Sequence, residues 1–409
     1  MLEALSLHEL DQRWERCRCL LKEHLPEANG LMLFSRLNIY YFSGTFGNGL
    51  FWLPLEGKPV LLCRRGQERA LLESPLEHIY PFHSYKDIEG LLRYAGSPLS
   101  NIFAVEMNGL SWALGNSFSK YTSGFKHLPG DKIIAMARGK KTDWELERLR
   151  AAGAKHEKCL MELLPPLLRK GITELEIAHI LSDLFFQEGH HGILRMENYG
   201  EEVYLGHISI GESGNYPSVF NGPVGLRGAH PATPFMGSND VAWCEGQPLT
   251  IDNGFSFEGY HTDKTQVYWL GDQHGIPSTV QEAHHFCIEL QEWLAAHLKP
   301  GALPSELWRH SIASAEKKGW SEGFMGLNPN KVKFAGHGIG LAIDEYPVLA
   351  EGFDLPLEEG MVLAIEPKMG IRNFGIVGVE NTYEVTPAGG RSLTGANFDQ
   401  GIRCIPERL

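Results

Sequence analysis

Residues 248–270, PLTIDNGFSFEGYHTDKTQVYWL, hold two apolar runs, a connection that contains glycine, and two aspartates. Asp252 ends the first run, and Asp263 stands eleven residues later, just ahead of the second run. Apolar runs separated by a short link predict two adjacent antiparallel strands, here joined through residues 256–260. That arrangement brings both carboxylates to a similar height on strands that otherwise carry mostly apolar residues.

Three more residues with metal-binding side chains stand in apolar or glycine-rich surroundings. Glu366 closes the run MVLAI, Glu380 lies within GIVGVENTYEV, and His337 belongs to the glycine-rich turn GHGIG. Taken singly, these residues have ordinary explanations, such as a turn cap, an edge strand that faces solvent, or a buried core histidine. The two aspartates and these three residues together, in this order and context, favour a shared site.

A shared site needs positive charge, because burying an unpaired carboxylate costs on the order of several kcal/mol. Lys264 and Lys368 are the only cations beside the four acids in the sequence. Two divalent ions would balance four carboxylates, and His337 would add one nitrogen ligand. We therefore predict two divalent metal ions. The ligand set favours Mn²⁺, Co²⁺, Fe²⁺ or Zn²⁺ and does not choose among them.

The first part of the chain has a different pattern of apolar residues. Residues 1–137 alternate short apolar strands with helical stretches, which predicts an α/β domain. The predicted strands are 30–34, 49–53, 59–63 and 101–105, and the predicted helices are 7–24, 66–73, 85–94 and 108–120.

The character of the chain changes at the basic loop RGKK that begins at Arg138. Thr142-x-x-Glu145 and Thr173-x-x-Glu176 follow it, and each is a capping box that predicts the start of a helix. We place the domain boundary here, so that the two domains are residues 1–137 and 138–409.

Strands and glycine-rich turns dominate from about residue 190 onward, with further helices predicted near 277–299 and 304–319. Residues 221–246 form a long segment rich in glycine and proline. Such a length inside a compact domain is typical of a functional loop, and we expect it near the mouth of the pocket.

The composition restricts the partners. A chain of 409 residues exceeds what one core usually spans, and its net charge of −13 argues against a nucleic-acid or anionic-membrane surface. No apolar run approaches the ~18–20 residues that cross a bilayer.

The N-terminal segment predicts an amphipathic helix and lacks the layout of a signal peptide. The seven cysteines are scattered, which suits reduced thiols in the cytoplasm better than a disulfide framework.

The order Asp, Asp, His, Glu, Glu resembles that of the M24 metallopeptidases of pita-bread fold, which include Xaa-Pro dipeptidase, Xaa-Pro aminopeptidase and methionine aminopeptidase. The matching segments are IDNGFSFEGYHTDKT, GHGIGL, AIEPKMG and GVENTYEVT. By this resemblance the metal ligands are Asp252, Asp263, His337, Glu366 and Glu380. The hinge RGKKTDWELERLRAAG and the segments NIYYFSG and GKPVLLCRRG extend the resemblance to a creatinase/prolidase N-terminal domain.

The resemblance implies an α+β fold class over nearly the whole chain. A pita-bread catalytic domain would cover residues 138–409, and an α/β creatinase-type domain would precede it over residues 1–137. The resemblance also implies a homodimer.

Three positions depart from the prolidase-like members. Asp344 stands where those members have a second histidine, seven residues after the ligand histidine. Gly378 and Gln266 stand where those members commonly have arginines. An ionised aspartate cannot donate a hydrogen bond to an oxyanion, although it attracts an ammonium group. We predict that Asp344 contacts the substrate, and an aspartate in a turn is the structural alternative.

A further family histidine lies upstream of the first aspartate ligand, and its counterpart depends on where an insertion is placed. His230, 22 residues before Asp252, is the nearest candidate for a catalytic histidine. With the gap placed elsewhere, Ser218 takes that position. His207 is close by in the sequence, and we predict it as a substrate-binding residue.

The resemblance implies a dinuclear metal-dependent hydrolase of peptide or amide bonds, in which Glu366 shuttles the proton and the substrate is a small peptide with proline after the cleaved bond. The alternative is a creatinase- or ectoine-hydrolase-like C–N hydrolase of a small non-peptide compound. The altered substrate positions favour that alternative, and the five retained ligands count against it. A non-catalytic module that binds a protein or nucleic acid is a third hypothesis, for which neither lost ligands nor charged extensions are seen.

Overall fold

The computed structural model describes residues 4–197 and 203–406. The chain divides into two compact units, Met1–Arg138 and Gly139–Leu409. None of the helices in these described ranges has the length and apolar composition that crossing a membrane requires.

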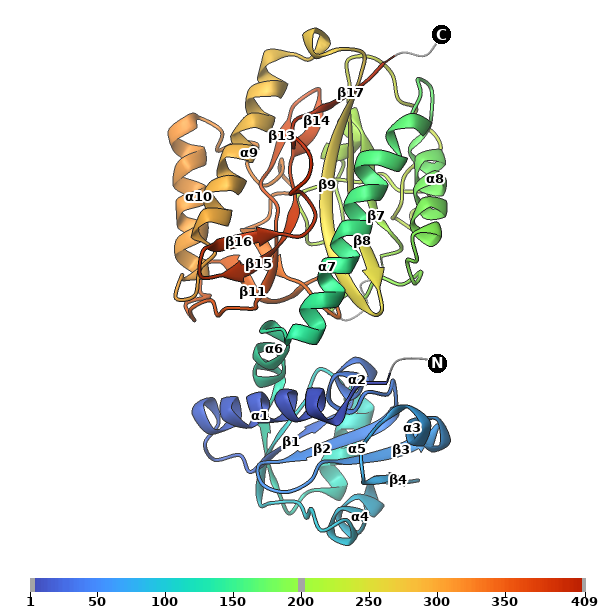
Figure 1. The fold of residues 1–409 in the computed structure, drawn as a ribbon, viewed down its shortest axis with the longest axis vertical. Helices are drawn as coiled ribbons and strands as arrows, with labels where there is room; N and C mark the ends of the chain where they lie inside the picture. The colour runs from blue at the N-terminus through green and yellow to red at the C-terminus, as the bar shows by residue number, and fades with distance from the viewer. Residues whose placement is uncertain (1–3, 198–202, 407–409) are drawn as a thin grey trace. The chain divides into compact units, whose positions relative to one another are not determined.

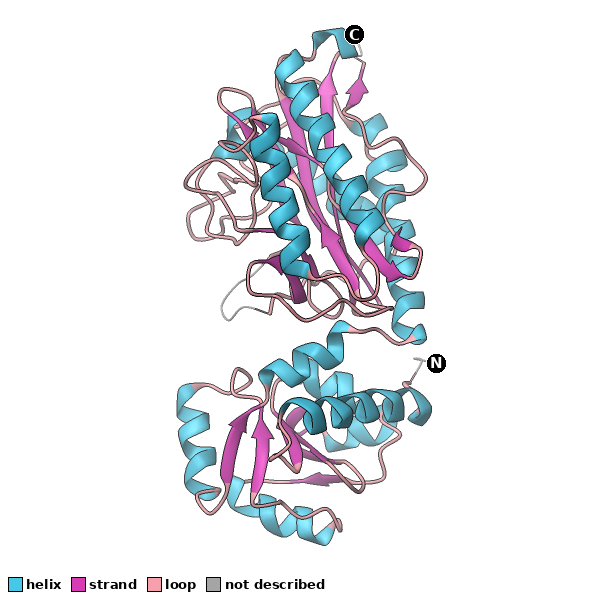
Figure 2. Ribbon diagram, turned by 90° about the vertical axis from the view of Figure 1, so that its left-hand side faces the viewer, coloured by secondary structure: helices cyan, strands magenta, loops and turns pink. Residues whose placement is uncertain are grey.

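The first unit is a mixed sheet with helices packed around it (Figures 1 and 2). The strand order is β4-β3-β2-β1-β5-β6; β1, β2 and β3 pair antiparallel, and the remaining pairs are parallel. Its helices and strands are α1 (Leu7–His24), β1 (Gly30–Leu33), α2 (Arg36–Ser43), β2 (Asn48–Pro54), β3 (Val60–Arg65), α3 (Gln67–Glu73), β4 (Ile79–Pro81), α4 (Ile88–Tyr94), β5 (Ile102–Val105), α5 (Trp112–Tyr121), β6 (Lys126–Pro129) and α6 (Asp131–Gly139).

The predicted elements of this unit are confirmed with small shifts at their ends. Helix α1 covers the expected residues, and Ser6 caps it with its hydroxyl. Helix α5 begins later than expected, because Ser111 supplies its cap. Four elements were not predicted from the sequence, namely α2, α6, β4 and β6. Helix α2 is capped by Ser35 and ends at Gly44, where φ is 79°.

The second unit places helices on either side of its strands, with α7 and α8 on one side and α9 and α10 on the other (Figure 1). One sheet has the order β17-β9-β8-β7, another has the order β11-β10-β12-β15-β16, and β13 and β14 form a separate pair. The helices and strands are α7 (Asp143–Lys158), α8 (Glu174–Gln187), β7 (Gly206–Ile210), β8 (Pro248–Phe257), β9 (Tyr260–Leu270), α9 (Ser278–His297), α10 (Pro304–Lys318), β10 (Phe334–Gly338), β11 (Glu345–Ala350), β12 (Val362–Ile365), β13 (Lys368–Ile371), β14 (Gly375–Gly378), β15 (Asn381–Thr386), β16 (Gly389–Ser392) and β17 (Arg403–Ile405).

Both predicted capping boxes are confirmed. In α7 and in α8, the threonine hydroxyl accepts from the backbone of the glutamate three residues on, and the glutamate side chain accepts from the threonine backbone. The helices expected near 277–299 and 304–319 are α9 and α10.

The β8–β9 hairpin predicted from the two apolar runs is also confirmed. Asp252 lies opposite Thr265, and Asp263 lies opposite Gly254. The two aspartates are therefore diagonal neighbours on one face of the hairpin, because side chains alternate between faces. The other face packs against α7 and α8 through a core that includes Ile251.

Residues 221–246 form an irregular segment that runs beside β7. The backbone N–H of Ile208 donates to the carbonyl of Met236 at 2.9 Å, and Met236 bridges to His207. The segment thus lies next to the strand that adjoins Asp252.

Candidate metal centre

The acidic face of the hairpin meets the five-stranded sheet at one junction. The backbone N–H of Thr265 donates to the carbonyl of Glu380 at 3.2 Å. The hydroxyl of Thr382 accepts from the backbone N–H of Asp263 and donates to its carbonyl, both at 2.9 Å. These bonds hold Asp263 and Glu380 at the same place, although they are 117 residues apart in the chain.

The strand order of the five-stranded sheet brings two more predicted residues, His337 and Glu366, to this junction. Strand β12 is hydrogen-bonded on one side to β10 and on the other to β15. His337 pairs with Ala364 in β12, while Glu366 and Glu380 flank the pair Ile365–Asn381. The imidazole and the two glutamates are therefore side by side at the edge of the hairpin.

Asp263, His337 and Glu380 form a group suited to a metal ion. One ligand atom from each lies within 4.8 Å of the others. The Nδ1 of His337 is 3.1 Å from the carbonyl of Gly338. When Nδ1 carries the proton and donates to that carbonyl, Nε2 is left as the free lone pair that a metal ion needs.

The remaining carboxylate oxygens surround the ammonium of Lys368, which is fully buried at the start of β13. Its Nζ lies 2.6 Å from Glu380 Oε2, 2.9 Å from Glu366 Oε2 and 3.3 Å from Asp252 Oδ2. Thr265 joins the same network, with its hydroxyl 2.8 Å from Asp252 Oδ1 and 3.0 Å from Glu380 Oε2.

The electrostatics follow from burying several like charges around one cation. Burial, followed by the charge of Asp252, raises the pKa of Asp263 well above its usual value. Burial, followed by the charge of Asp263, does the same to the pKa of Glu380. Burial opposes ionisation of Asp252, but the ammonium of Lys368 and hydrogen bonds outweigh it and lower the pKa of that carboxyl. Burial also opposes the charge on Lys368, and the surrounding carboxylates raise its pKa well above the usual value. The carboxyl groups outnumber the ammonium, and the raised pKa values of Asp263 and Glu380 reflect that excess. A further cation would therefore be stabilised at this centre.

His207 faces this centre and His230 lies apart from it. His207 is buried on β7 directly opposite Asp252, and burial lowers its pKa. His230 is exposed, and its Nδ1 accepts a hydrogen bond from the backbone of Ala232 within its own turn. Of these two histidines, His207 contacts the acidic centre and His230 does not.

Asp344 is half-buried in the turn before β11. Its Oδ1 accepts a hydrogen bond from the backbone N–H of Glu197 at 2.8 Å. The neighbouring N–H of Ile343 donates to the carbonyl of Arg195 at 2.8 Å. Asp344 therefore links two segments of backbone, which matches the structural alternative considered for it and leaves a substrate contact untested.

The other two departures differ in position. Gln266 is buried and points away from the centre, donating to the carbonyl of Val267 at 3.1 Å. Gly378 lies directly opposite Lys368 in the β13–β14 pair. Ser218, the alternative to His230, donates its backbone N–H to the side chain of Asn330 at 2.9 Å.

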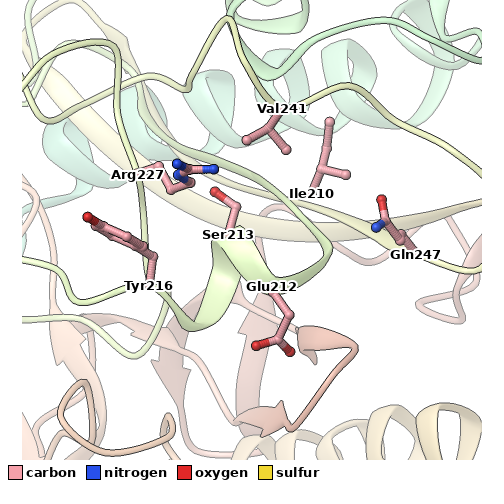
Figure 3. Close-up of a pocket in the computed structure, with 7 residues that line it drawn as sticks. All are labelled: Ile210, Glu212, Ser213, Tyr216, Arg227, Val241 and Gln247. Carbon is pink, nitrogen blue, oxygen red and sulfur yellow. The ribbon is translucent and has the colours of Figure 1, made fainter.

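A cavity of about 260 Å³ opens elsewhere in the unit (Figure 3). Its lining includes the charged side chains of Arg227 and Glu212, together with Tyr216. None of its lining residues belongs to the acidic centre, so the cavity is separate from it.

Lys368 and Thr265 were not predicted as site residues from the sequence. A signal was present for both, because each stands two residues after a predicted ligand, Glu366 or Asp263, within extended backbone. Residues two apart on a strand share a face. For Lys368 the intervening Pro367 interrupts the strand, so the direction of the side chain is settled only by the fold.

Two protein-family models match the chain. The model of metallopeptidase family M24 matches residues 147–387, and the model of the Creatinase/Prolidase N-terminal domain matches residues 13–140. A putative dipeptidase, YkvY, from Bacillus subtilis is 26% identical over 390 residues, which are 90% of this chain and 95% of that protein.

An Xaa-Pro dipeptidase from Pyrococcus furiosus is 25% identical over 362 residues, covering 88% of this chain and 91% of that protein. The crystal structure of an X-Pro aminopeptidase from Thermotoga maritima covers 96% of this chain and 99% of its own, with a TM-score of 0.75 and 22% identity. At that identity the likeness concerns the fold. The predicted α+β fold class, a pita-bread domain after a creatinase-type N-terminal domain, is confirmed.

Proposed function

The chain belongs to metallopeptidase family M24 and is a hydrolase, and from that membership we propose that it cleaves small peptides at the centre built from Asp263, His337 and Glu380. The observation that carries the proposal is the convergence of one imidazole nitrogen and two carboxylates within 4.8 Å, inside a larger group of buried acids. Oxygen ligands with one imidazole suit divalent manganese, cobalt, iron or zinc.

The roles of the side chains follow from their positions. Asp263, His337 and Glu380 would hold a divalent ion, which would supply Lewis-acid chemistry by lowering the pKa of a water molecule and polarising the scissile carbonyl. Glu366 Oε1 lies 3.6 Å from His337 Nε2, at the edge of the proposed ion site. This carboxylate is therefore placed to accept the proton of the attacking water and to pass it to the leaving nitrogen.

The substrate-facing residues remain proposals. We propose His207 as a contact of the substrate, because it is buried beside Asp252 and its lowered pKa keeps the imidazole neutral near pH 7. Asp344 is proposed to attract a cationic group of the substrate. His230 is the weakest of the three proposed roles, because its hydrogen bond holds it in an exposed turn.

The substrate we propose is a dipeptide or short peptide. The name of the Pyrococcus furiosus relative, Xaa-Pro dipeptidase, supports proline at the second position as the first substrate to test. The test is a dipeptide panel assayed with protein stripped by a chelator and then reloaded with Mn²⁺, Co²⁺, Fe²⁺ or Zn²⁺. We expect turnover to disappear on stripping and to return with at least one of these ions; a stripped protein with full activity would refute the proposal.

One observation favours the second candidate, a metal-independent C–N hydrolase of a small non-peptide compound. The buried ammonium of Lys368 already compensates part of the acidic charge. Hydrolysis of a creatine-like amidine or urea compound by the stripped protein, with no turnover of dipeptides, would decide for this candidate.

We propose that residues 138–409 carry the catalytic function, because every predicted ligand lies there. A homodimer is proposed from the resemblance to two-domain prolidases, and a monomer mass that stays constant with concentration in light scattering would contradict it. The seven free and scattered thiols support the cytoplasm as the compartment we propose. That the protein binds two ions remains a prediction from the sequence. The contacts of Lys368 with three carboxylates are relevant to that number.

A further inference from the structure

Glu366 and Glu380 divide their oxygens between two halves of the centre. The Oε1 atoms face His337 Nε2, at 3.6 Å from Glu366 and 3.9 Å from Glu380. The Oε2 atoms of both residues face Lys368 Nζ instead, at 2.9 and 2.6 Å. Carboxylates that bridge two cations have this arrangement, with one oxygen for each cation. Here one of the two cation positions is filled by the side chain of a residue.

The half that faces Lys368 has no space for an ion as well. An ion bound by Asp252 Oδ2, Glu366 Oε2 and Glu380 Oε2 would sit about 2.0–2.2 Å from each oxygen. Lys368 Nζ lies within 3.3 Å of all three. A divalent ion at that point would be in contact with a like charge that is fully buried.

The opposite strand passes close to the backbone and stem of this lysine. Gly378 pairs with Lys368 across β13 and β14, at a φ of +143°. A Cβ there would come within 2.6 Å of Lys368 Cα and 3.1 Å of its Cγ. A larger residue at 378 would displace the backbone of Lys368 and the first part of its side chain, and with them the ammonium from its place among the carboxylates.

We propose that the ammonium of Lys368 occupies one cation position of a two-cation centre, and that the protein binds one divalent ion per chain, at Asp263, His337 and Glu380. The inference rests on the proposed function for the existence of the ion. It changes the number of ions from two to one and makes Lys368 a residue that sets the metal content.

The first measurement uses the whole wild-type protein, stripped and then dialysed against Mn²⁺. We expect elemental analysis and calorimetric titration to give one ion per chain, and electron paramagnetic resonance to give the spectrum of isolated Mn²⁺. Two ions per chain with a magnetically coupled spectrum would overturn the inference and leave the proposed function intact. No bound ion in any of these measurements would overturn both.

The second measurement changes the lysine. Lys368→Met removes the charge and leaves three buried carboxylates without their cation, so we expect the variant to bind two Mn²⁺ ions and to give the coupled spectrum. Lys368→Gln carries the same expectation should the methionine variant fail to fold. A folded variant that still binds one ion would show that Lys368 does not set the number.

A matched control is Lys264→Met, which also replaces a fully buried lysine. The ammonium of Lys264 contacts the amide oxygens of Asn381 and Gln400 at 2.8 and 3.3 Å instead of carboxylates. We expect this variant to keep one ion. A second ion in the control as well would mean that the loss of any buried lysine raises the count, which would refute the specific role of Lys368.

Discussion

Both faces of the β8–β9 hairpin are largely buried, but the charged groups on them have different neighbours. On the face with Asp252 and Asp263, carboxylates gather around the ammonium of Lys368, and charge is balanced by charge. On the face toward α7 and α8, two buried histidines are held neutral. Burial, and then the charge of Lys264, keep the pKa of His156 well below its usual value, and burial lowers the pKa of His190 to about 4.

Two lysines make the contrast direct, since both are fully buried. The pKa of Lys368 is raised because carboxylates surround it. The pKa of Lys264 is lowered to about 8, because burial is the dominant cause and its contacts are uncharged amides. Burial alone therefore does not decide the pKa of a side chain, because the charge of its neighbours also shifts it. The predictions below test this difference between the two faces.

The largest expected effect is on the charged face. Asp263→Ala removes a proposed ligand, so we expect loss of the bound ion and a fall in turnover of at least ~10³-fold, the scale on which loss of one catalytic group acts. Elemental analysis and dipeptide assays would measure both.

Asn253→Ala, in β8 on the opposite face of the hairpin, is the matched control. The side-chain amide of Asn253 has no hydrogen-bond partner among the described residues. We expect metal content and turnover to stay unchanged. Equal losses in both variants would mean that the two faces do not differ in function.

A smaller effect is expected from Lys264→Met. The folded pKa of about 8 lies below the ordinary 10.5, so the unfolded chain binds more protons between these values and stability rises with pH across that window. Below pH 8 the wild type bears the full cost of burying the charge. We expect the variant to be more stable at pH 7 by on the order of 1–3 kcal/mol, with a gain that shrinks from pH 8 to 10.5. Denaturant unfolding at several pH values would measure this, and a gain independent of pH would contradict it.

Stability should also respond to acid through the buried histidines of the face toward α7 and α8. The folded pKa of His190 is about 4 and its ordinary value is 6.5, so its contribution to stability is complete above pH 6.5 and is lost as pH falls toward 4. Between pH 7 and pH 5 we expect a loss on the order of 1–2 kcal/mol from this residue. His190→Phe keeps an aromatic ring beside Phe185 and Phe255 and should flatten the dependence. The same slope in both proteins would assign the loss to other groups.

The smallest effect is expected at Asp344, outside the buried centre. Asp344→Asn keeps an oxygen for the N–H of Glu197 and removes only the charge. If the charge selects a cationic substrate group, turnover should fall by less than about tenfold, the scale of one screened charge pair, with unchanged metal content. Unchanged rates and substrate preferences across the dipeptide panel would leave Asp344 as a turn residue only.

Local patterns in the sequence predicted much of this fold. The capping boxes at Thr142 and Thr173 act within three residues, so their outcome depends on neighbours in the chain. The hairpin alternation, which places Asp252 and Asp263 on one face, is equally local. Helix α2 was not predicted, because its eight residues show little periodicity and its clearest signals are the Ser35 cap and the Gly44 terminus.

The family resemblance predicted which five residues meet, and only the tertiary structure decided what else meets them. Whether His207 or His230 faces Asp252 depends on strand pairing between β7 and β8 and on the course of the loop beside them. The direction of Lys368 depends on β13 leaving the five-stranded sheet to pair with β14 opposite Gly378. A sequence states that a lysine stands two residues from a glutamate. The oxygens that lie within 3.3 Å of its ammonium come from segments that are distant in the chain, and only the fold brings them together. These charges interact strongly, because burial removes the water that would screen them.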